Sequence, residues 1–390
     1  MLFYVNITYL LPNQNIPFMK TNRIIICLLL FVATSADKCK PDTSGDVYRG
    51  EQYITLNQLA DSLKNEFDQA MADGRVMKYA FVIRNEKTKV SRQGGKRNGS
   101  NTDFTIDDRY NLASVTKTIT AVALLQLIEK KHLSIEDKIW NYLPANWNTS
   151  NIKGVSFRQV LMHNAGFSYI PGDETYDSVR RTIEIGVDPA RVEDHHYENI
   201  NYGICRILVA YLDGFNAAFE PDQGVGTSKH FIGYVQKNIF DPINISSVLF
   251  KPSGYSDEPM FYKFPPAISG PGYYDGGNWS LKPGSAGAFL SVSELSEFLY
   301  RLCLDETLLS NNMKSKMNLS TTLMGWDDAN NFEGDKFLYK GGYLPDGDAK
   351  SAIYKFDNGL QISIMFNNPD NSPDYFHNAY SKAWAHSKTR

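Results

Sequence analysis

Residues 114–125 read Ser-Val-Thr-Lys-Thr-Ile-Thr-Ala-Val-Ala-Leu-Leu and form the clearest helix signal in the chain. The pattern predicts a helix over 115–131 whose first half is apolar on nearly every side, so we expect it to lie in the core. Ser114 and Lys117 lie three residues apart at its start, which places a hydroxyl and an amine one turn apart on the same face. A serine hydroxyl becomes a good nucleophile only when a neighbouring base takes its proton.

Lys117 can be that base only as a neutral amine. Burial beside the apolar helix and a second cation nearby would both lower the pKa of Lys117. Lys340, which begins the sequence Lys-Gly-Gly on a predicted strand, is the candidate for the second cation. Tyr197 and Asn199, in the sequence Tyr-Glu-Asn, would add a hydroxyl and an amide. Ser114 also precedes the helix, whose positive dipole end favours developing anionic charge.

Each of these three motifs is weak when it is taken alone. A chain of this length and composition contains the Ser-x-x-Lys spacing by chance about once or twice. The spacing recurs at Ser35 and Ser150, and neither of those copies opens an apolar helix. The order and the setting of the three motifs together therefore favour an acyl-transfer site.

The composition is that of a globular protein with an ample core. The chain has 390 residues, of which 42% are hydrophobic and 21% charged, enough for one large domain or two ordinary ones. A net charge of −3 gives no strong field, so we expect neither a nucleic acid nor an anionic membrane as a partner. His195 and His196 are adjacent and point in different directions without a ligand cluster, so we expect no metal and no cofactor.

Residues 1–36 are predicted to be a leader and signal peptide. A basic segment at 19–23 precedes an apolar run at 24–33 and small residues at 34–36. The run is about half the length that a membrane-spanning helix needs, so we expect no stable membrane span. The mature protein would be secreted or otherwise extracytoplasmic, periplasmic in a bacterium. Whether translation begins at Met1 or Met19 stays open.

The cysteines are compatible with export. If Cys27 leaves with the signal peptide, Cys39, Cys205 and Cys303 remain, and this odd count leaves at least one thiol unpaired within the chain. One disulfide among the three and three small core residues are both open interpretations.

Hydrophobic periodicity and turn signals predict an α+β fold, an antiparallel sheet flanked by helices and built from both chain ends. Strands are predicted at 79–83, 88–92, 336–341, 350–356 and 360–366. Helices are predicted at 55–72, 115–131, 202–212, 229–240 and 375–387, with capping-box starts at Ser134, Ser156 and Ser291. The predicted division is a sheet domain from 37–133 and 288–390, with a mainly helical region inserted at 134–287.

Several stretches resemble the successive signatures of the serine β-lactamase-related family, which contains class C β-lactamases, D,D-peptidases and many esterases. The resemblance covers residues 55 to 385 in the family's order. It is carried by 111–121, 160–167, 197–203, 241–245, 285–291 and 340–345.

This resemblance implies a role for each matching position. Ser114 matches the acylated nucleophile, Lys117 its proton acceptor, and Lys340 the start of the third motif. Tyr197 matches a tyrosine that moves a proton to the leaving group, a role for which we expect flanking cations to lower its pKa. Asn199 matches a residue that bonds the substrate amide or orders the lysine.

The family's oxyanion hole uses two backbone N–H groups, which fall here on Ser114 and Tyr343. Gly341 and Gly342 complete the expected substrate-binding strand. Tyr343 is bulky where the family often has a small residue, so we expect a narrower cleft beside the oxyanion hole. The acidic sequence at 346–348 is a second departure. We therefore rank an esterase first, a D,D-peptidase second and a β-lactamase third, acting on a small-molecule or peptide substrate.

A catalytically inactive, secreted binding or scaffold protein of the same fold is the alternative. The complete set of Ser114, Lys117, Tyr197, Asn199 and Lys340 favours the enzyme, and the oligomeric state stays open. His163 is predicted to be structural, at a helix end. An aromatic cluster has two open interpretations, lining of a pocket or plain packing, and comprises Tyr255, Phe261, Tyr262, Phe264, Tyr273 and Tyr274.

Overall fold

The computed structural model describes residues 45–98, 101–167, 174–254, 259–262, 273–319, 321–345, 348–368 and 375–389. The predicted signal peptide, Cys27 and Cys39 lie outside the described residues, as do Tyr255 and Phe264 of the aromatic cluster. Phe261 packs with its ring centroid 4.0 Å from that of Tyr110. Within the described ranges, no helix has the length and apolar character needed to cross a bilayer.

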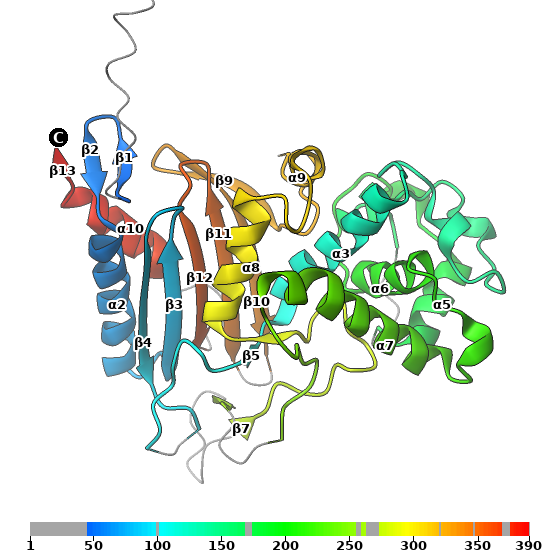
Figure 1. Ribbon diagram of the computed structural model, residues 1–390, viewed down its shortest axis with the longest axis horizontal. Coiled ribbons are helices and arrows are strands. Elements are labelled where there is room, and N and C mark those ends of the chain that lie inside the picture. Colours follow the sequence, from blue (N-terminus) through cyan, green and yellow to red (C-terminus); the bar gives the residue numbers. More distant parts are fainter. Residues whose placement is uncertain are drawn as a thin grey trace, which may run out of the picture. The chain divides into compact units, whose positions relative to one another are not determined.

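A six-stranded antiparallel sheet joins the two ends of the chain (Figure 1). Its order is β4-β3-β12-β11-β10-β9, and the β12–β3 pairing brings the C-terminal strands against the N-terminal ones. This arrangement confirms the predicted fold class. The strands are β3 (Lys78–Arg84), β4 (Lys89–Gly95), β9 (Asp328–Phe332), β10 (Asp335–Leu344), β11 (Ala349–Phe356) and β12 (Gln361–Asn367).

Helices cover both faces of this sheet. Successive β3 residues point to opposite sides, as in any strand. Tyr79 and Phe81 join one core cluster with α2 (Leu56–Ala72) and α10 (Tyr375–Ala385). Ala80 and Val82 join a second cluster with α3 (Thr116–Lys130) and α8 (Val292–Leu304). The sheet therefore separates two cores, and the site residues lie on the side of α3.

Helix α3 follows a short 3₁₀ turn at Ala113–Val115. Its residues from Thr116 to Leu125 are all buried, which confirms the prediction made from their apolar pattern. The helix packs against α6 (Ile200–Leu212) and α7 (Gln223–Val235).

The remaining elements are short. Three of them are the helices α4 (Phe157–Leu161), α5 (Tyr176–Ile185) and α9 (Asn311–Met317). The loops also contain 3₁₀ turns at Ile139–Tyr142, Ser150–Ile152, Pro189–Arg191, Ala217–Phe219 and Asp241–Ile243. A π-helical turn at Gln236–Phe240 follows α7. Small sheets pair β1 (Val47–Arg49), β2 (Gln52–Ile54) and β13 (Lys388–Thr389), then β5 (Tyr110–Asn111) with β8 (Phe289–Leu290), and β6 (Phe261–Tyr262) with β7 (Tyr273–Tyr274).

The predicted helix start at Ser134 is wrong. Asp137 Oδ2 accepts a hydrogen bond from Ser134 N at 2.9 Å, and Ser134 Oγ accepts one from Glu136 N at 3.2 Å. These local bonds close a turn instead of capping a helix. Ser156 and Ser291, by contrast, form complete capping boxes, so those two helix starts are confirmed. Two further differences concern α7 and β9. Helix α7 begins at Gln223, before the predicted start at 229, and strand β9 was not predicted at all.

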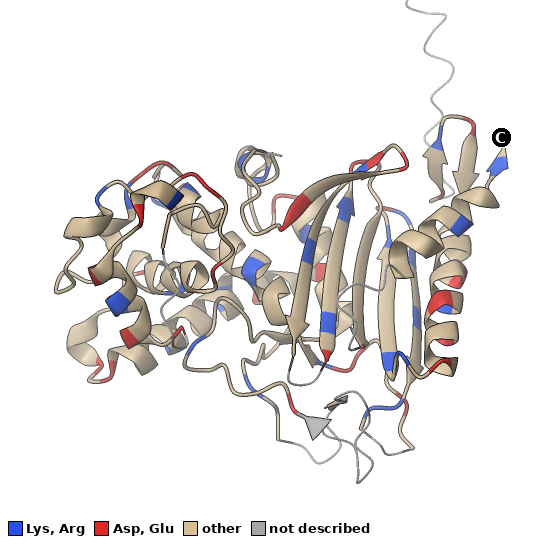
Figure 2. Cartoon of the chain, turned by 180° about the vertical axis from the view of Figure 1, so that it is seen from behind, with Lys and Arg blue, Asp and Glu red and all other residues tan. Residues whose placement is uncertain are grey.

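Residues Gly45–Arg390 form one compact unit, and the division into a sheet domain and a helical insert stays a prediction. Cys205 and Cys303 are both free thiols, so they form no disulfide with each other. Basic and acidic side chains are interspersed over the strands and helices (Figure 2). This mixture agrees with the small net charge.

Candidate active site

The structure brings together residues from three distant segments of the chain. The Nζ atom of Lys117 lies 3.0 Å from Ser114 Oγ and 2.7 Å from Asn199 Oδ1. The Tyr197 ring lies beside both lysines, with its centroid 4.8 Å from Lys117 Nζ and 5.0 Å from Lys340 Nζ. Ser114 and Lys117 come from the start of α3, Tyr197 and Asn199 from the segment before α6, and Lys340 from β10.

The chain just before Ser114 is held in an unusual conformation. Ala113 has a φ of 45°, in the left-handed region that non-glycine residues seldom adopt. Its N–H donates to Asn111 Oδ1 at 2.8 Å, and the Asn111 amide donates to Gly276 O at 2.7 Å. These two bonds fix the turn that presents Ser114 at the beginning of the helix.

Lys117 is fully buried and has three oxygen neighbours. Besides Ser114 and Asn199, its Nζ lies 2.8 Å from the carbonyl oxygen of Ser285. Burial lowers the pKa of Lys117 well below its usual value, and the nearby charge of Lys340 lowers it further. The carboxylates of Asp327 and Glu174 act in the opposite direction without reversing the shift. The sequence analysis predicted both causes of the lowered Lys117 pKa, burial and a second cation at Lys340.

Asp327 is a site residue that sequence reasoning missed. It forms an ion pair with the buried Lys340, and its Oδ2 accepts a hydrogen bond from Gly341 N at 3.0 Å. Burial lowers the pKa of Lys340, while the Asp327 charge raises it. No motif surrounds Asp327, and only the pairing of β9 with β10 places it beside the Lys-Gly-Gly strand.

Tyr197 differs from the expectation that flanking cations would lower its pKa. The residue is 44% exposed, but desolvation around its hydroxyl raises the pKa above the usual value. A hydrogen bond with Ser114 opposes this shift and does not outweigh it. Tyr197 is therefore a neutral phenol at neutral pH, suited to donating a proton and not to removing one.

His163 has a closer relation to the site than the structural role predicted for it. It follows α4 with a φ of 58°, and its ring stacks on Tyr197 with centroids 4.4 Å apart. His163 Nδ1 accepts a hydrogen bond from Glu198 N at 3.2 Å. Burial and the charges of Lys117 and Lys340 lower its pKa, so the imidazole is neutral. A neutral ring thus supports the inner face of Tyr197.

The edge of β10 beside Ser114 presents backbone groups. Strand β9 pairs with residues 335–339 of β10 in the described part of the chain, and β11 pairs along its other side. The N–H of Gly341 points away from β11, because it donates to Asp327. In a strand the N–H direction alternates, so the N–H of Tyr343 points to the same edge. This is the direction that the predicted oxyanion hole requires.

Gly342 must be glycine at this edge. A Cβ atom there would collide with the Leu112 carbonyl oxygen and lie 3.1 Å from Ser114 N. Ser351 Oγ donates to the same carbonyl at 2.6 Å and holds the loop against the strand. The close approach of β10 to residues 112–114 therefore depends on the missing side chain.

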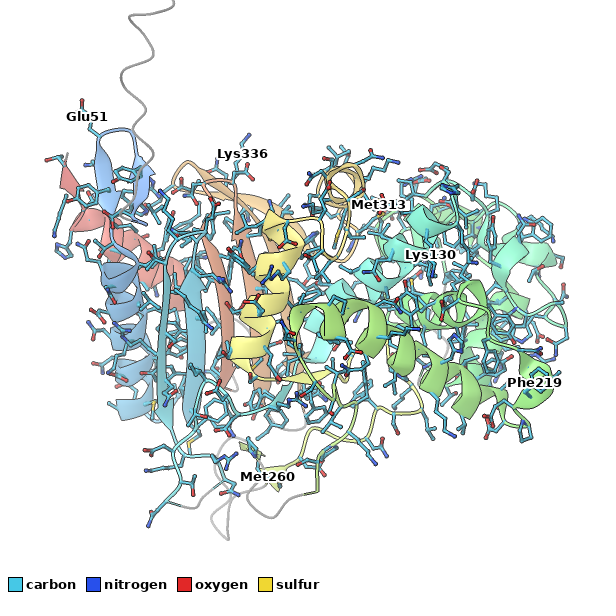
Figure 3. All side chains as sticks on the ribbon, viewed as in Figure 1. Glu51, Lys130, Phe219, Met260, Met313 and Lys336 are labelled. Atoms are coloured by element: carbon cyan, nitrogen blue, oxygen red, sulfur yellow. The ribbon has the colours of Figure 1, made fainter. Side chains whose placement is uncertain are left out.

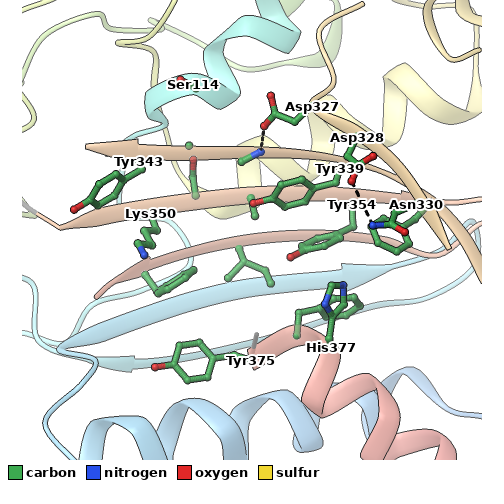
Figure 4. A pocket seen from close by; sticks show the side chains of 18 of the residues that line it. Ser114, Asp327, Asp328, Asn330, Tyr339, Tyr343, Lys350, Tyr354, Tyr375 and His377 are labelled. Carbon is green, nitrogen blue, oxygen red and sulfur yellow. Dashed lines mark hydrogen bonds between the residues drawn. The ribbon is translucent and has the colours of Figure 1, made fainter. Parts of the chain in front are cut away.

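A cavity of about 680 Å³ opens beside these groups (Figure 4). Its lining includes Ser114, Tyr197, Asn199, Asp327 and the strand residues Gly341, Gly342 and Tyr343. In the described part of the chain, no group of three or more His, Cys, Asp or Glu side chains is placed to hold a metal ion. The arrangement suits nucleophilic attack by Ser114 on a carbonyl carbon bound in the cavity.

The sequence profile of the β-lactamase family matches residues 63–383. The chain belongs to this family. Curated relatives of this β-lactamase-family protein are named as hydrolases.

A curated relative is the teichoic acid D-alanine hydrolase of Staphylococcus aureus, 22% identical over 221 residues, which are 54% of this chain and 52% of the relative. The chain thus matches about half the length of the curated relatives. Two solved structures share its fold. The octameric penicillin-binding protein homologue of Pyrococcus abyssi has a TM-score of 0.67 at 19% identity, covering 83% of this chain and 77% of that one. A class C β-lactamase of Rhodobacter sphaeroides has a TM-score of 0.64 at 15% identity, covering 83% and 98%.

The substitution Gly342→Ala tests the close approach of β10. A methyl group would push the strand away from residues 112–114 and displace one oxyanion donor, so kcat/KM for an ester should fall by about 100-fold or more. Gly154→Ala is the matched control, because a Cβ at Gly154 meets no atom within 4 Å. Steady-state kinetics with thermal unfolding measures both variants, and unchanged activity of folded Gly342→Ala would contradict the geometry.

The substitution Lys340→Gln tests the electrostatic coupling. Lys340 lowers the pKa of Lys117, so its removal raises that pKa, and the unpaired Asp327 raises it further. The rising limb of the profile of kcat/KM against pH should move to higher pH, by about one unit or more. Lys336→Gln, an exposed lysine on the same strand, should leave the limb in place. A limb that stays put in Lys340→Gln would refute the coupling.

Proposed function

We propose that this β-lactamase-family protein cleaves an ester or amide through an acyl-Ser114 intermediate, and that esters are its preferred substrates. The contact of Lys117 with Ser114, inside a buried set of acceptors, carries this proposal. We further propose that the protein works outside the cytoplasm, as its predicted signal peptide implies.

Burial lowers the pKa of Lys117 and so supports a neutral amine, and its three oxygen neighbours can satisfy that form. A neutral amine has two N–H donors and one lone pair. The carbonyl oxygens of Asn199 and Ser285 can only accept, so they use the two donors. In this neutral form the lone pair is left for the third neighbour, Ser114 Oγ at 3.0 Å, whose O–H would then donate to it. Lys117 is thus arranged to accept the proton that the nucleophile must lose.

The proposed reaction has two balanced steps. In the first, Ser114 Oγ bonds to the substrate carbonyl carbon and its proton passes to Lys117. The bond to the leaving oxygen or nitrogen then breaks, and this atom takes a proton from Tyr197, which Lys117 replenishes. In the second, water attacks the acyl-Ser114 ester, which releases the acid and restores the serine hydroxyl. The N–H groups of Ser114 and Tyr343 would stabilise the oxyanion in both steps.

The relatives include a named hydrolase and a named amidase, so they support acyl hydrolysis without fixing the acyl group. The curated relatives are named as hydrolases of D-alanine on teichoic acid. The solved structures include a penicillin-binding protein homologue and a class C β-lactamase, so peptidase and β-lactamase activities rank next. A secreted binding protein that has lost turnover is the alternative function. It has no need for a buried lysine aimed at a serine.

A fluorophosphonate probe tests the nucleophile. Because the probe reacts with activated serines, peptide mass spectrometry should find the label on Ser114 alone. Ser114→Ala should abolish both labelling and ester hydrolysis, and Lys117→Met should slow labelling by about 100-fold or more. Ser315→Ala, an exposed serine on α9, is the control. A folded protein that takes no label would support the binding function instead.

A further inference from the structure

The cavity beside Ser114 continues past β10 to the other face of the sheet. Lys340 and Gly342 point to the side of α3, where they meet Tyr197 and Ser114. Side chains alternate along a strand, so Tyr339, Gly341 and Tyr343 point to the opposite side. Gly342 of the first side and all three residues of the second line the same cavity, which therefore passes around the β10 edge (Figure 4).

Strand register gives this far part of the cavity the form of a trough. Gly341 pairs with Ala352 on β11, and Ala352 pairs with Ile364 on β12. All three line the cavity. The ring of Tyr339 leans over Gly341, since a Cβ atom there would collide with the Tyr339 hydroxyl. The small side chain of Ala352 leaves a low floor beyond that ring, next to Ile364. From Gly341 to Ile364 the trough spans two interstrand spacings, about 10 Å.

Larger side chains form the two walls of the trough. One wall is the pair Tyr339 and Tyr354, whose ring centroids lie 5.0 Å apart. The other is the pair Tyr343 and Lys350, with the ammonium 5.0 Å from the ring centroid. The hydroxyl of Tyr343 donates to Asp348 Oδ1 at 3.2 Å, which fixes that ring. The bulky Tyr343 thus borders the trough, whereas the sequence predicted that it would narrow the cleft beside the oxyanion hole.

The inner end of the trough is apolar. Phe366 of β12, Phe67 of α2 and Phe376 of α10 line it, and all three are buried. Exposed polar groups lie on β9, at Asp328 and Asn330, and the cavity lining also includes Lys350, Tyr375 and His377. A site with an apolar interior and a polar rim favours a hydrophobic group over a hydroxylated one.

We propose that this trough, with floor Ala352 and Ile364 between tyrosine walls, binds an apolar, ring-bearing arm of the substrate. The inference rests on the proposed function and specifies its substrate class, esters with an aryl or similar arm a few bonds from the reacting carbonyl. An alanyl group alone would leave most of a 680 Å³ cavity unfilled. Aromatic walls at fixed positions suit a flat ring, which stacks on them.

Paired ester substrates test the trough. On the acyl side, p-nitrophenyl 4-phenylbutyrate carries the arm and p-nitrophenyl acetate lacks it. On the alcohol side, 4-phenylbutyl acetate carries the arm and ethyl acetate lacks it. In one of the two series, the arm should raise kcat/KM by about tenfold or more, as expected for burying a phenyl group. Equal rates within both series would overturn the proposal. A stronger preference for esters with a glucosyl arm would overturn the apolar assignment.

Filling the floor should remove the preference. Ala352→Phe places a ring between Gly341 and Ile364, so the ratio of kcat/KM for the armed and plain esters should fall toward one. Ala352→Leu is a smaller filler, for use if the first variant does not fold, and should reduce the ratio in part. Phe219→Ala removes an aromatic ring that is 85% exposed in the helical region and should keep the ratio (Figure 3). An unchanged ratio in a folded Ala352 variant would refute the trough.

Failure of this inference differs from failure of the proposed function. If plain esters are hydrolysed in a Ser114-dependent manner and the arm has no effect, only the trough is refuted. If no ester reacts and Ser114 takes no fluorophosphonate label, the acyl-serine function itself is refuted.

Discussion

The structure depends on one buried amine. Lys117 lies inside the core with two carbonyl oxygens and one serine hydroxyl around its nitrogen. A charged ammonium would be costly at such a depth, and a neutral amine avoids most of that cost while keeping a lone pair that can accept the Ser114 proton. The apolar residues of α3 are what bury it. The same stretch of sequence thus forms the centre of the core and prepares the base, which links the stability of the fold to the proposed chemistry.

The second requirement is a strand that comes close enough to the nucleophile. The Lys340-Gly341-Gly342 edge meets the turn at Ser114 only because β10 belongs to a sheet made from both chain ends. Lys340 then contributes a charge that lowers the pKa of Lys117, and Asp327 holds that lysine and the Gly341 N–H in place. Charge, backbone donors and close packing are therefore supplied by one short segment, and a displacement of β10 would disturb all three together.

Local patterns predicted much of this arrangement. The buried helix, the helix starts at Ser156 and Ser291, and five of the six strands of the sheet each follow from periodicity or from side chains a few residues apart. Ser114 and Lys117 were likewise found from their spacing. Asp327 and the contact of His163 with Tyr197 were not, because strand pairing and long-range packing create them. At Ser134 the local pattern was misleading, because its side chain closes a local turn and no helix follows it.

The pKa of Tyr197 has a consequence for the direction of proton flow. Two lysines beside a phenol were expected to make it more acidic, yet burial of its hydroxyl raises its pKa instead. A neutral phenol is unsuited to taking the proton of Ser114, whereas Lys117, whose pKa moves downward, is the group that the proposed function uses as the base. When the pKa values of two neighbouring groups are shifted in opposite directions, one group suits the role of acid and the other that of base. The neutral ring of His163 adds no charge beside Tyr197 and Lys117, so it does not reduce the difference between their pKa values.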